Sequence, residues 1–399
     1  MSDEMPEGWS ATDIGSLFAV NTPGHWGEDG GDGSNVFVLR SANFLKSGGL
    51  KYETAAPRKF DQKKLGQKRL AAGDILLERS GGSPAQPVGR VNRFEADGVF
   101  SASNFLQILR VRQEVDGWFA YYLLDGFYAA GGTENLQKAT TGIRNLDFAA
   151  YLATSVLLPP LDEQRRIAKV LRSVDEAIAR EIDVNEAAEA SLDHALAATI
   201  PSPEKIGGHW TTTTIGEFAT VITGKTPSTK DAGLWGGEIP FVTPTDMDGS
   251  VRSVRAARSI TQAAIKQTKI APANSVLFTC IASIGKLCLN QEPVAFNQQI
   301  NACACRDATD AAFLYWTLRR LTPQIRAMSG TTAVPIVNKT AFSRVSFALP
   351  PPASRHEIVE VLSSISEVIE SALRTISSLT ELKRRISSDL LSGRVRVPA

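Results

Sequence analysis

The sequence predicts an α+β protein with two similar mixed α/β domains, each followed by a long helix. Three observations predict this fold. The segment Leu158-Pro159-Pro160 and the apolar positions after it return roughly 190 residues later, at Leu349-Pro350-Pro351. Each half also opens with a tryptophan followed by an Ile-Gly pair, and a heptad-like series of apolar residues closes each half. A repeat this long is typical of a duplicated domain rather than of a solenoid.

Short apolar runs bounded by glycine and polar residues predict buried strands in both halves. The first half has Val36–Leu39 and Ile75–Leu77, and the second has Ile239–Val242 and Ser275–Phe278. We therefore expect one mixed domain at residues 1–157 and a second at residues 201–348.

Two long helices are expected at residues 158–200 and 349–399, the first with Asp162 as its N-cap. The apolar series begins at Ile167 in the first and at Ile358 in the second. Each helix would have about 35–40 residues, and a single apolar stripe on so long a helix needs a partner. We expect the two to pair as an antiparallel coiled coil. The alternative is that each helix folds onto its own domain.

Composition and cysteine usage indicate a cytoplasmic protein that does not enter a membrane. The chain is 43% hydrophobic and 21% charged with a net charge of +1, and no apolar run approaches the ~18 residues that span a bilayer. The N-terminus lacks the pattern of a signal peptide. The four cysteines have no CxxC spacing and no nearby histidine, so packed, reduced thiols are expected and a metal site is not.

Catalytic signatures are missing from the sequence. It contains no GxGxxG, P-loop, GxSxG or HExxH motif, and no Asn-Pro-Pro-Tyr/Phe signature of an amino-methyltransferase. Four histidines in 399 residues are few for an acid–base enzyme. The sequence predicts a chain without catalytic activity.

Polar loops recur in the same order in both halves and favour a nucleic-acid surface. Gly/Ser turns carry Ser83 and Arg90 in the first half and Lys286 in the second, and Asn104 corresponds to Asn297-Gln298-Gln299. Basic residues suit phosphates, and amides can pair with base edges. Solvated loops are the alternative. The basic residues expected to contact phosphates are Arg58, Lys63, Lys64, Lys68, Arg258, Lys266 and Lys269.

With these residues in view, the chain resembles the specificity subunit of type I restriction–modification systems over nearly its whole length. The most specific match is Leu158–Ile167, which is similar to the line that opens the family's helical spacer. Other matches are Met5–Trp9, Gly224–Ser228, Gly237–Val242, Ser283–Lys286 and Asn297–Ile300.

The chain also departs from the family pattern in two places. The second helix begins with Ala353-Ser354-Arg355-His356-Glu357, so the Glu-Gln pair of the first copy is lost there. Asn21–His25 stands in the first half where the second has Gly224–Ser228. We therefore expect the two domains to read different DNA sequences.

The resemblance implies two target recognition domains that bind the two parts of a bipartite double-stranded DNA site. In the second domain, readout is expected from Lys225, Thr226, Ser228, Thr229, Asn297, Gln298 and Gln299. Two modification (methyltransferase) subunits that carry S-adenosylmethionine would dock on the helices, near Glu163, Gln164, Arg165 and Arg166. Restriction subunits would join this complex, which defends the host against foreign DNA. The alternative is a coiled-coil adaptor with two protein-binding globular domains.

Overall fold

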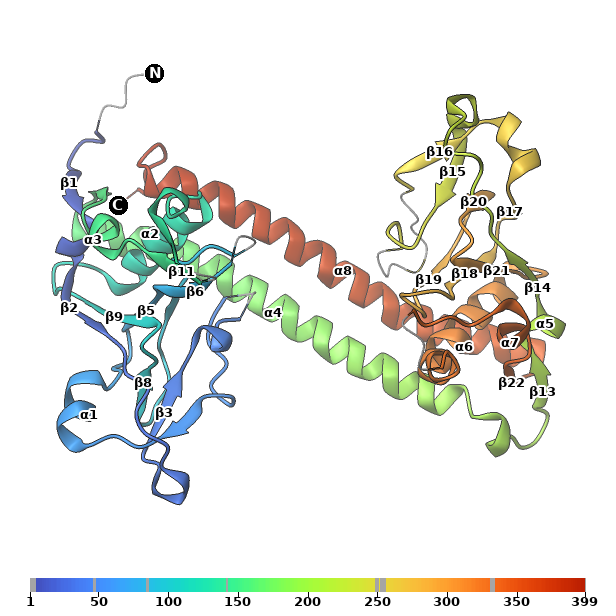
Figure 1. The fold of residues 1–399 in the computed structure, drawn as a ribbon, viewed down its shortest axis with the longest axis horizontal. Coiled ribbons are helices and arrows are strands. Elements are labelled where there is room, and N and C mark those ends of the chain that lie inside the picture. Colours follow the sequence, from blue (N-terminus) through green and yellow to red (C-terminus); the bar gives the residue numbers. More distant parts are fainter. Residues whose placement is uncertain are drawn as a thin grey trace. The chain divides into compact units, whose positions relative to one another are not determined.

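The computed structural model describes residues 5–45, 48–83, 86–140, 143–247, 251, 256–330 and 334–398. It divides into two compact units (Figure 1). Unit 1 comprises Met1–Arg180 with Ile376–Ala399, and unit 2 comprises Glu181–Thr375. Both boundaries fall inside long helices, so each unit holds one mixed domain and a part of both helices.

The mixed domain of unit 1 is built on two small sheets. The first is antiparallel in the order β2 (Phe18–Pro23), β9 (Leu106–Val111), β5 (Ile75–Glu78) and β7 (Val91–Arg93). The second has the order β4 (Ala56–Arg58), β3 (Val36–Leu39) and β8 (Phe100–Ala102), with β3 and β8 parallel. Ile75, Leu76 and Leu77 are fully buried, as the run of apolar residues predicts.

Smaller elements complete unit 1. Strand β1 (Ser10–Asp13) pairs with β12 (Ser155–Leu158), and a third sheet joins β10 (Gln137–Thr140), β11 (Ile143–Leu146) and β6 (Ser80–Gly82). The short helices are α1 (Gln62–Lys68), α2 (Gly117–Ala129) and α3 (Phe148–Leu152). An aspartate caps the N-terminus of each: Asp61, Asp116 and Asp147.

Unit 2 repeats this plan. Its antiparallel sheet has the order β14 (Thr220–Thr223), β21 (Ile300–Ala304), β18 (Ser275–Thr279) and β19 (Leu287–Leu289). Its second sheet has the order β16 (Arg258–Ile260), β15 (Trp235–Val242), β20 (Val294–Phe296) and β17 (Ile270–Ala271). Strands β15 and β20 are parallel, as β3 and β8 are in unit 1. The four strands expected from the sequence are therefore confirmed, and the duplication extends to strand topology.

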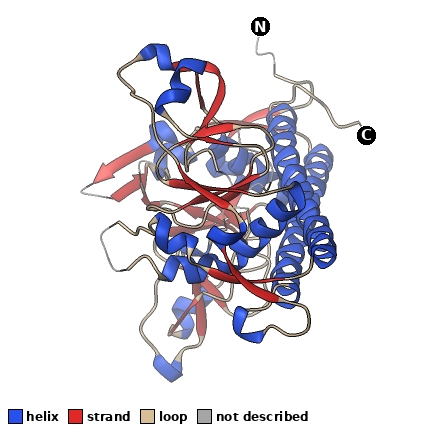
Figure 2. Cartoon of the chain, turned by 90° about the vertical axis from the view of Figure 1, so that its right-hand side faces the viewer, coloured by secondary structure: helices blue, strands red, loops and turns tan. Residues whose placement is uncertain are grey.

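The other elements of unit 2 follow the same order as in unit 1. Strand β13 (Thr211–Thr214) pairs with β22 (Ser346–Leu349), next to α5 (Ile215–Phe218), α6 (Ala308–Ala327) and α7 (Lys339–Ser343). Figure 2 looks onto this unit and shows strands gathered on one side of the long helices.

The two long helices are α4 (Leu161–Thr199, 39 residues) and α8 (Pro352–Leu391, 40 residues). In unit 1, Ile167 near the start of α4 shares a core with Leu390 near the end of α8. In unit 2, Leu196 near the end of α4 shares a core with Ile358 near the start of α8. The helices thus pair in antiparallel directions, which confirms the expected arrangement. Helix α4 begins at Leu161, so Asp162 lies in its first turn rather than at the N-cap.

The cysteines are free thiols packed in unit 2, with Cys280, Cys288 and Cys303 buried. Burial raises the pKa of Cys280 to about 12, so this thiol stays protonated at neutral pH. None of the helices formed by the described residues is long and apolar enough to cross a membrane.

Candidate nucleic-acid interface

In unit 2 the segment Gly224–Ser228, here called the Gly224 loop, rests on the short connection between β20 and β21. The Gly224 N–H donates to the carbonyl of Ile300 at 3.1 Å, and the Lys225 N–H donates to the carbonyl of Phe296 at 3.0 Å. A Cβ at Gly224 would collide with the carbonyl oxygen of Asn297, so only glycine allows this approach. The loop is therefore held in place by its backbone.

This placement brings together several side chains predicted to read bases. Thr226 Oγ1 donates to Gln298 Oε1 at 2.7 Å, while the side chains of Lys225 and Gln298 are exposed. Asn297 and Gln299 are half-buried, and Asn297 Nδ2 donates to Gln299 Oε1 at 3.0 Å. Exposed Lys225 and Gln298 and half-buried Thr226 thus form one polar group, and the Asn297 and Gln299 amides bond to each other in the same connection.

Trp235 positions the far end of the Gly224 loop, a role that the sequence did not indicate. Its indole N–H donates to the carbonyl of Ser228 at 3.0 Å, and the Arg258 guanidinium lies 3.6 Å from its ring centroid. Ser228, Thr229 and Arg258 are exposed. Because Trp235 opens a strand, its sequence context marks it as a sheet residue and gives no sign of this contact.

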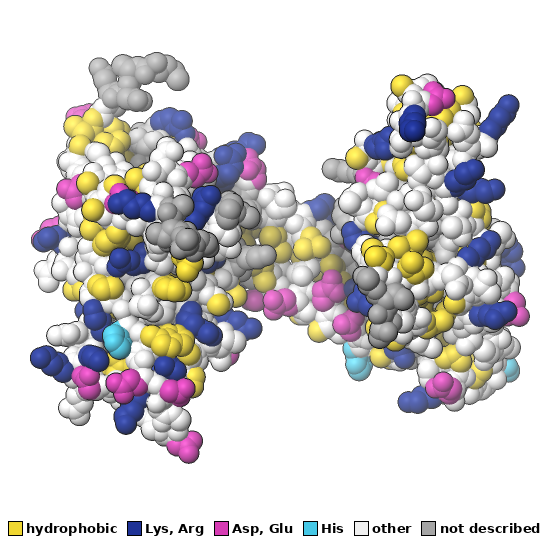
Figure 3. Space-filling model, in the orientation of Figure 1, with side chains coloured by type: hydrophobic (Ala, Val, Ile, Leu, Met, Phe, Trp, Pro, Cys, Tyr) yellow, Lys and Arg dark blue, Asp and Glu magenta, His cyan; other side chains and the backbone are white. Residues whose placement is uncertain are grey.

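The remaining predicted residues of unit 2 are also exposed. Lys266 and Lys269 carry no ion pair among the described residues. Lys286 is exposed but donates from Nζ to the carbonyl of Pro244 at 2.7 Å. Figure 3 shows Lys and Arg side chains on the displayed face of each unit.

In unit 1 the predicted basic residues differ in their exposure and in the contacts that they make within the protein. Lys63 and Lys64 are exposed on α1, and Lys68 at the end of α1 donates to Thr22 Oγ1 on β2 at 2.5 Å. Arg58 is half-buried: it donates to the carbonyl of Trp26 at 3.2 Å and lies over the Trp26 ring. Arg58 therefore has an internal role, whereas Lys63 remains available to a phosphate, and Lys64 is exposed with an ion pair to Asp61 at 3.8 Å.

Arg90 forms an ion pair with an acidic residue inside the domain. Its guanidinium forms two hydrogen bonds with Glu78, at 2.8 and 3.1 Å, and the Glu78 side chain is almost completely buried. A buried carboxylate needs this countercharge, so Arg90 has a structural role in the domain, and its contact with DNA stays a prediction. Ser83 and Asn104 are exposed, as a contact with DNA requires.

Two of the four residues predicted to bind a partner are instead buried. The Glu163 carboxylate accepts from Trp9 Nε1 at 3.0 Å and from Arg396 at 2.6 and 2.7 Å, and these hydrogen bonds hold its pKa below the ordinary value. Gln164 accepts from the Asp116 N–H and donates to the carbonyl of Pro159, both at 2.8 Å. Both side chains are buried and hydrogen-bonded within unit 1, and a partner contact at these two positions stays a prediction.

The other two residues of this group reach the surface. Arg166 is half-buried and donates to the carbonyl of Val397 at 3.3 Å. Arg165 is exposed and lines a cavity of about 450 Å³ together with Trp118, Lys169 and Arg172. The start of α4 therefore presents a mixed charged and aromatic surface, on which Arg165 is paired with Asp162 and Arg172 with Glu176, both at 3.1 Å.

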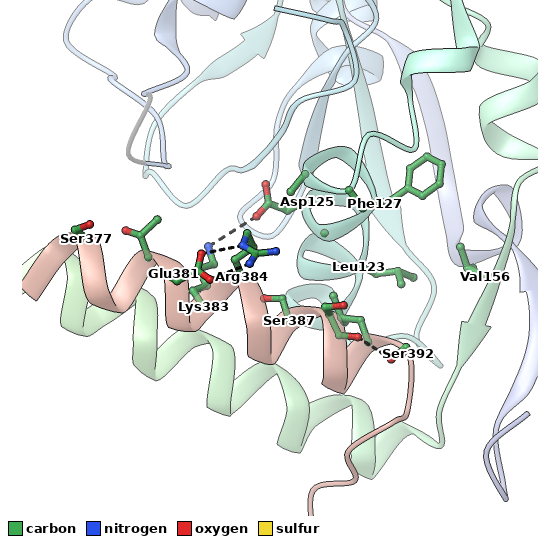
Figure 4. Close-up of a pocket in the computed structure, with 16 residues that line it drawn as sticks. Leu123, Asp125, Phe127, Val156, Ser377, Glu381, Lys383, Arg384, Ser387 and Ser392 are labelled. Carbon is green, nitrogen blue, oxygen red and sulfur yellow. Dashed lines mark hydrogen bonds and ion pairs between the residues drawn. The ribbon is translucent and has the colours of Figure 1, made fainter. Parts of the chain in front are cut away.

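A larger cavity of about 870 Å³ lies between α2 and α8 in unit 1 (Figure 4). Apolar residues such as Leu123 and Phe127 form much of its wall. Lys383 is paired with Asp175 at 2.8 Å and with Asp125 at 3.8 Å. Burial raises the pKa of Asp125, and Lys383 opposes this shift. Within the described ranges, no cluster of His, Cys, Asp or Glu suits a metal ion.

Comparison with known proteins identifies the fold and the family of this chain. A family model described as "Type I restriction modification DNA specificity domain" matches residues 34–190 and 208–381. The type I restriction enzyme MjaIX specificity subunit of Methanocaldococcus jannaschii is 30% identical over 173 residues, which are 42% of this chain and 40% of that protein. The putative type I restriction enzyme MjaX specificity subunit of the same organism is 21% identical, over 99% of this chain and 95% of that protein.

A solved structure has the same fold. The crystal structure of a type I restriction-modification system S subunit from M. genitalium matches with a TM-score of 0.65, 16% identity and 98% coverage of both chains. The family model matches two segments that together make up most of the chain. This protein belongs to the type I restriction modification DNA specificity domain family.

Proposed function

We propose that this chain is a non-catalytic DNA-recognition subunit that binds a bipartite double-stranded target and directs associated enzymes to it. The observation that carries this proposal is the polar group of Lys225, Thr226 and Gln298. Gly224, at which a Cβ would collide with the backbone, holds this polar group at the end of a sheet. Sites on rigid elements position hydrogen-bonding groups more precisely than free loops do.

Two kinds of contact are expected in each unit. Exposed lysines on short helical segments, such as Lys63 and Lys64 in unit 1 and Lys266 in unit 2, bind phosphates and set affinity without reading sequence. Lys225 and Gln298 reach base edges, because an ammonium donates to guanine and an amide pairs with adenine. Each unit would then read one part of the target.

The partners would be two modification (methyltransferase) subunits, which carry the S-adenosylmethionine, and restriction subunits that join them. Helix α8 supports such docking, because large apolar side chains along it are exposed: Val361 49%, Val368 47%, Leu373 52% and Leu382 45%. Exposed apolar residues on a long helix are typical of a surface that another protein covers. Arg165, which lines a pocket at the start of α4, would add a separate contact in unit 1.

The test is selection of DNA from a random double-stranded library by the full chain with its methyltransferase partner, at several salt concentrations. We expect two conserved sequence elements separated by unselected base pairs, and an affinity that falls steeply with salt. Selection of no sequence, with no salt-dependent binding, would reject the proposal and favour a protein-binding adaptor.

A further inference from the structure

Unit 1 contains a loop with the same backbone frame as the Gly224 loop. In the segment Pro23–Trp26, here called the Gly24 loop, the Gly24 N–H donates to the carbonyl of Leu106 at 2.9 Å. The His25 N–H donates to the carbonyl of Ala102 at 2.7 Å. These two hydrogen bonds match those made by Gly224 and Lys225 in unit 2.

The strand registers give the same correspondence. Pro23 on β2 pairs with Gln107 on β9, and Thr223 on β14 pairs with Asn301 on β21. The next residue in each unit is a buried glycine, and a Cβ on Gly24 would collide with the carbonyl oxygen of Ala102. Gly24 thus corresponds to Gly224, and His25 corresponds to Lys225.

This correspondence corrects the expectation from sequence, which placed the whole segment Asn21–His25 opposite Gly224–Ser228. The Thr-Pro pairs of the two segments are not equivalent, because one precedes its glycine and the other follows it. The connections from Ala102 to Leu106 and from Phe296 to Ile300 have the same length, so Asn104 takes the place of Gln298.

The side chain of His25 is held in place by contacts with Gly27 and Phe60. Its Nδ1 accepts from the Gly27 N–H at 2.8 Å, and its ring meets the Phe60 ring edge-on at a centroid distance of 5.3 Å. A neutral imidazole that accepts at Nδ1 carries its proton on Nε2. No described residue accepts from His25 Nε2, and the side chain is half-buried, so the ring is held in place while this donor has no partner among the described residues.

We infer that His25 is a specificity-determining residue of unit 1, and that its Nε2–H donates to an acceptor on a base edge in the first half of the target. The inference rests on the proposed function and assigns a reading group to a loop in which the sequence indicated none. Guanine O6 or N7, adenine N7 and thymine O4 are the acceptors that a single donor can meet in the major groove. Exposed Asn104 stands beside it as Gln298 stands beside Lys225.

The test uses the full chain with its methyltransferase partner and S-adenosylmethionine, acting on duplexes that carry the wild-type target or single-base variants of each half. For His25→Ala we expect discrimination at one base position of one half-site to fall by about 5- to 10-fold, because one hydrogen bond carries less than a bidentate pair. The other half-site should stay unchanged. The matched variant Lys225→Ala should relax the other half-site, and His25→Gln, which keeps a donor, should retain part of the discrimination.

Three results would overturn the inference. His25→Ala could leave every base preference intact while the wild-type chain still selects its target, which would reject this inference alone. It could weaken binding to all duplexes equally and lower the slope of log affinity against log salt concentration by about 0.9, which would indicate a phosphate contact. It could lower the unfolding temperature while specificity is kept, the sign of a structural role.

Discussion

Lys383 of α8 lies 2.8 Å from the Asp175 carboxylate of α4, and this ion pair joins the two helices within unit 1. Asp175 also accepts from the Tyr122 hydroxyl at 2.7 Å. The sequences of α4 and α8 repeat each other residue by residue. In unit 2, Leu192 stands at the position that corresponds to Lys383 and Ser366 at the one that corresponds to Asp175, and both are buried. The ion pair is therefore particular to unit 1 and is not repeated in unit 2.

Replacing Lys383 with methionine should destabilise unit 1. The change leaves Asp125 and Asp175 facing each other without a cation, although partial exposure of all three side chains limits the cost to about 1–3 kcal/mol. Urea unfolding measures this difference. Lys383→Arg, which keeps the charge, is the control, and equal midpoints for Lys383→Met and the wild type would show that the pair contributes nothing.

The Glu163–Arg396 pair should make stability depend on pH. Hydrogen bonds from Arg396 hold the pKa of Glu163 below 4.5 in the folded state. A carboxylate with a lowered pKa contributes stability above its unfolded pKa, and this contribution is lost as pH falls through the folded pKa. Arg396→Ala should therefore be less stable than the wild type at pH 7, and the gap should narrow as the pH falls through the lowered pKa of Glu163. Thermal unfolding from pH 3 to 7 measures it, and a gap of constant size would contradict the assignment.

Gln298→Ala should relax one base position in the half-site read by unit 2. The side chain is exposed, and it accepts a hydrogen bond from Thr226, so the free energy of unfolding should change by no more than about 0.5 kcal/mol. Discrimination at that position should fall by roughly 1–3 kcal/mol. Binding to single-base variants and urea unfolding separate the two effects. Lower stability with intact specificity would assign Gln298 a structural role.

Neutralising Lys63 and Lys64 should weaken binding to all DNA sequences alike. The logarithmic dependence of affinity on salt should flatten by up to about 0.9 for each phosphate that the variant no longer binds. Arg385→Gln serves as the control, because Arg385 is exposed on α8 and already paired with Glu381 at 2.7 Å. An unchanged salt dependence together with one degenerate base position would mean that these lysines read bases.

The sequence predicted the elements whose signal is local. Apolar runs such as Ile75–Leu77 became buried strands, and the heptad series became α4 and α8. Polar residues held by distant partners were harder to predict. Glu163 was expected to face a partner, but Trp9 and Arg396, far away in the chain, bind its carboxylate. Loop equivalence was also missed, because it is set by backbone hydrogen bonds at Gly24 and Gly224, which the sequence does not show.

The central claim is that each unit reads one part of a bipartite DNA target. The most direct measurement is base-resolution mapping of methylation in cells that lack other methyltransferases and express this chain with its methyltransferase partner. The account predicts one motif of two defined sequences separated by a fixed number of unspecified base pairs, with Lys225→Ala degrading one sequence alone. A continuous motif, or a variant that degrades both sequences together, would contradict it.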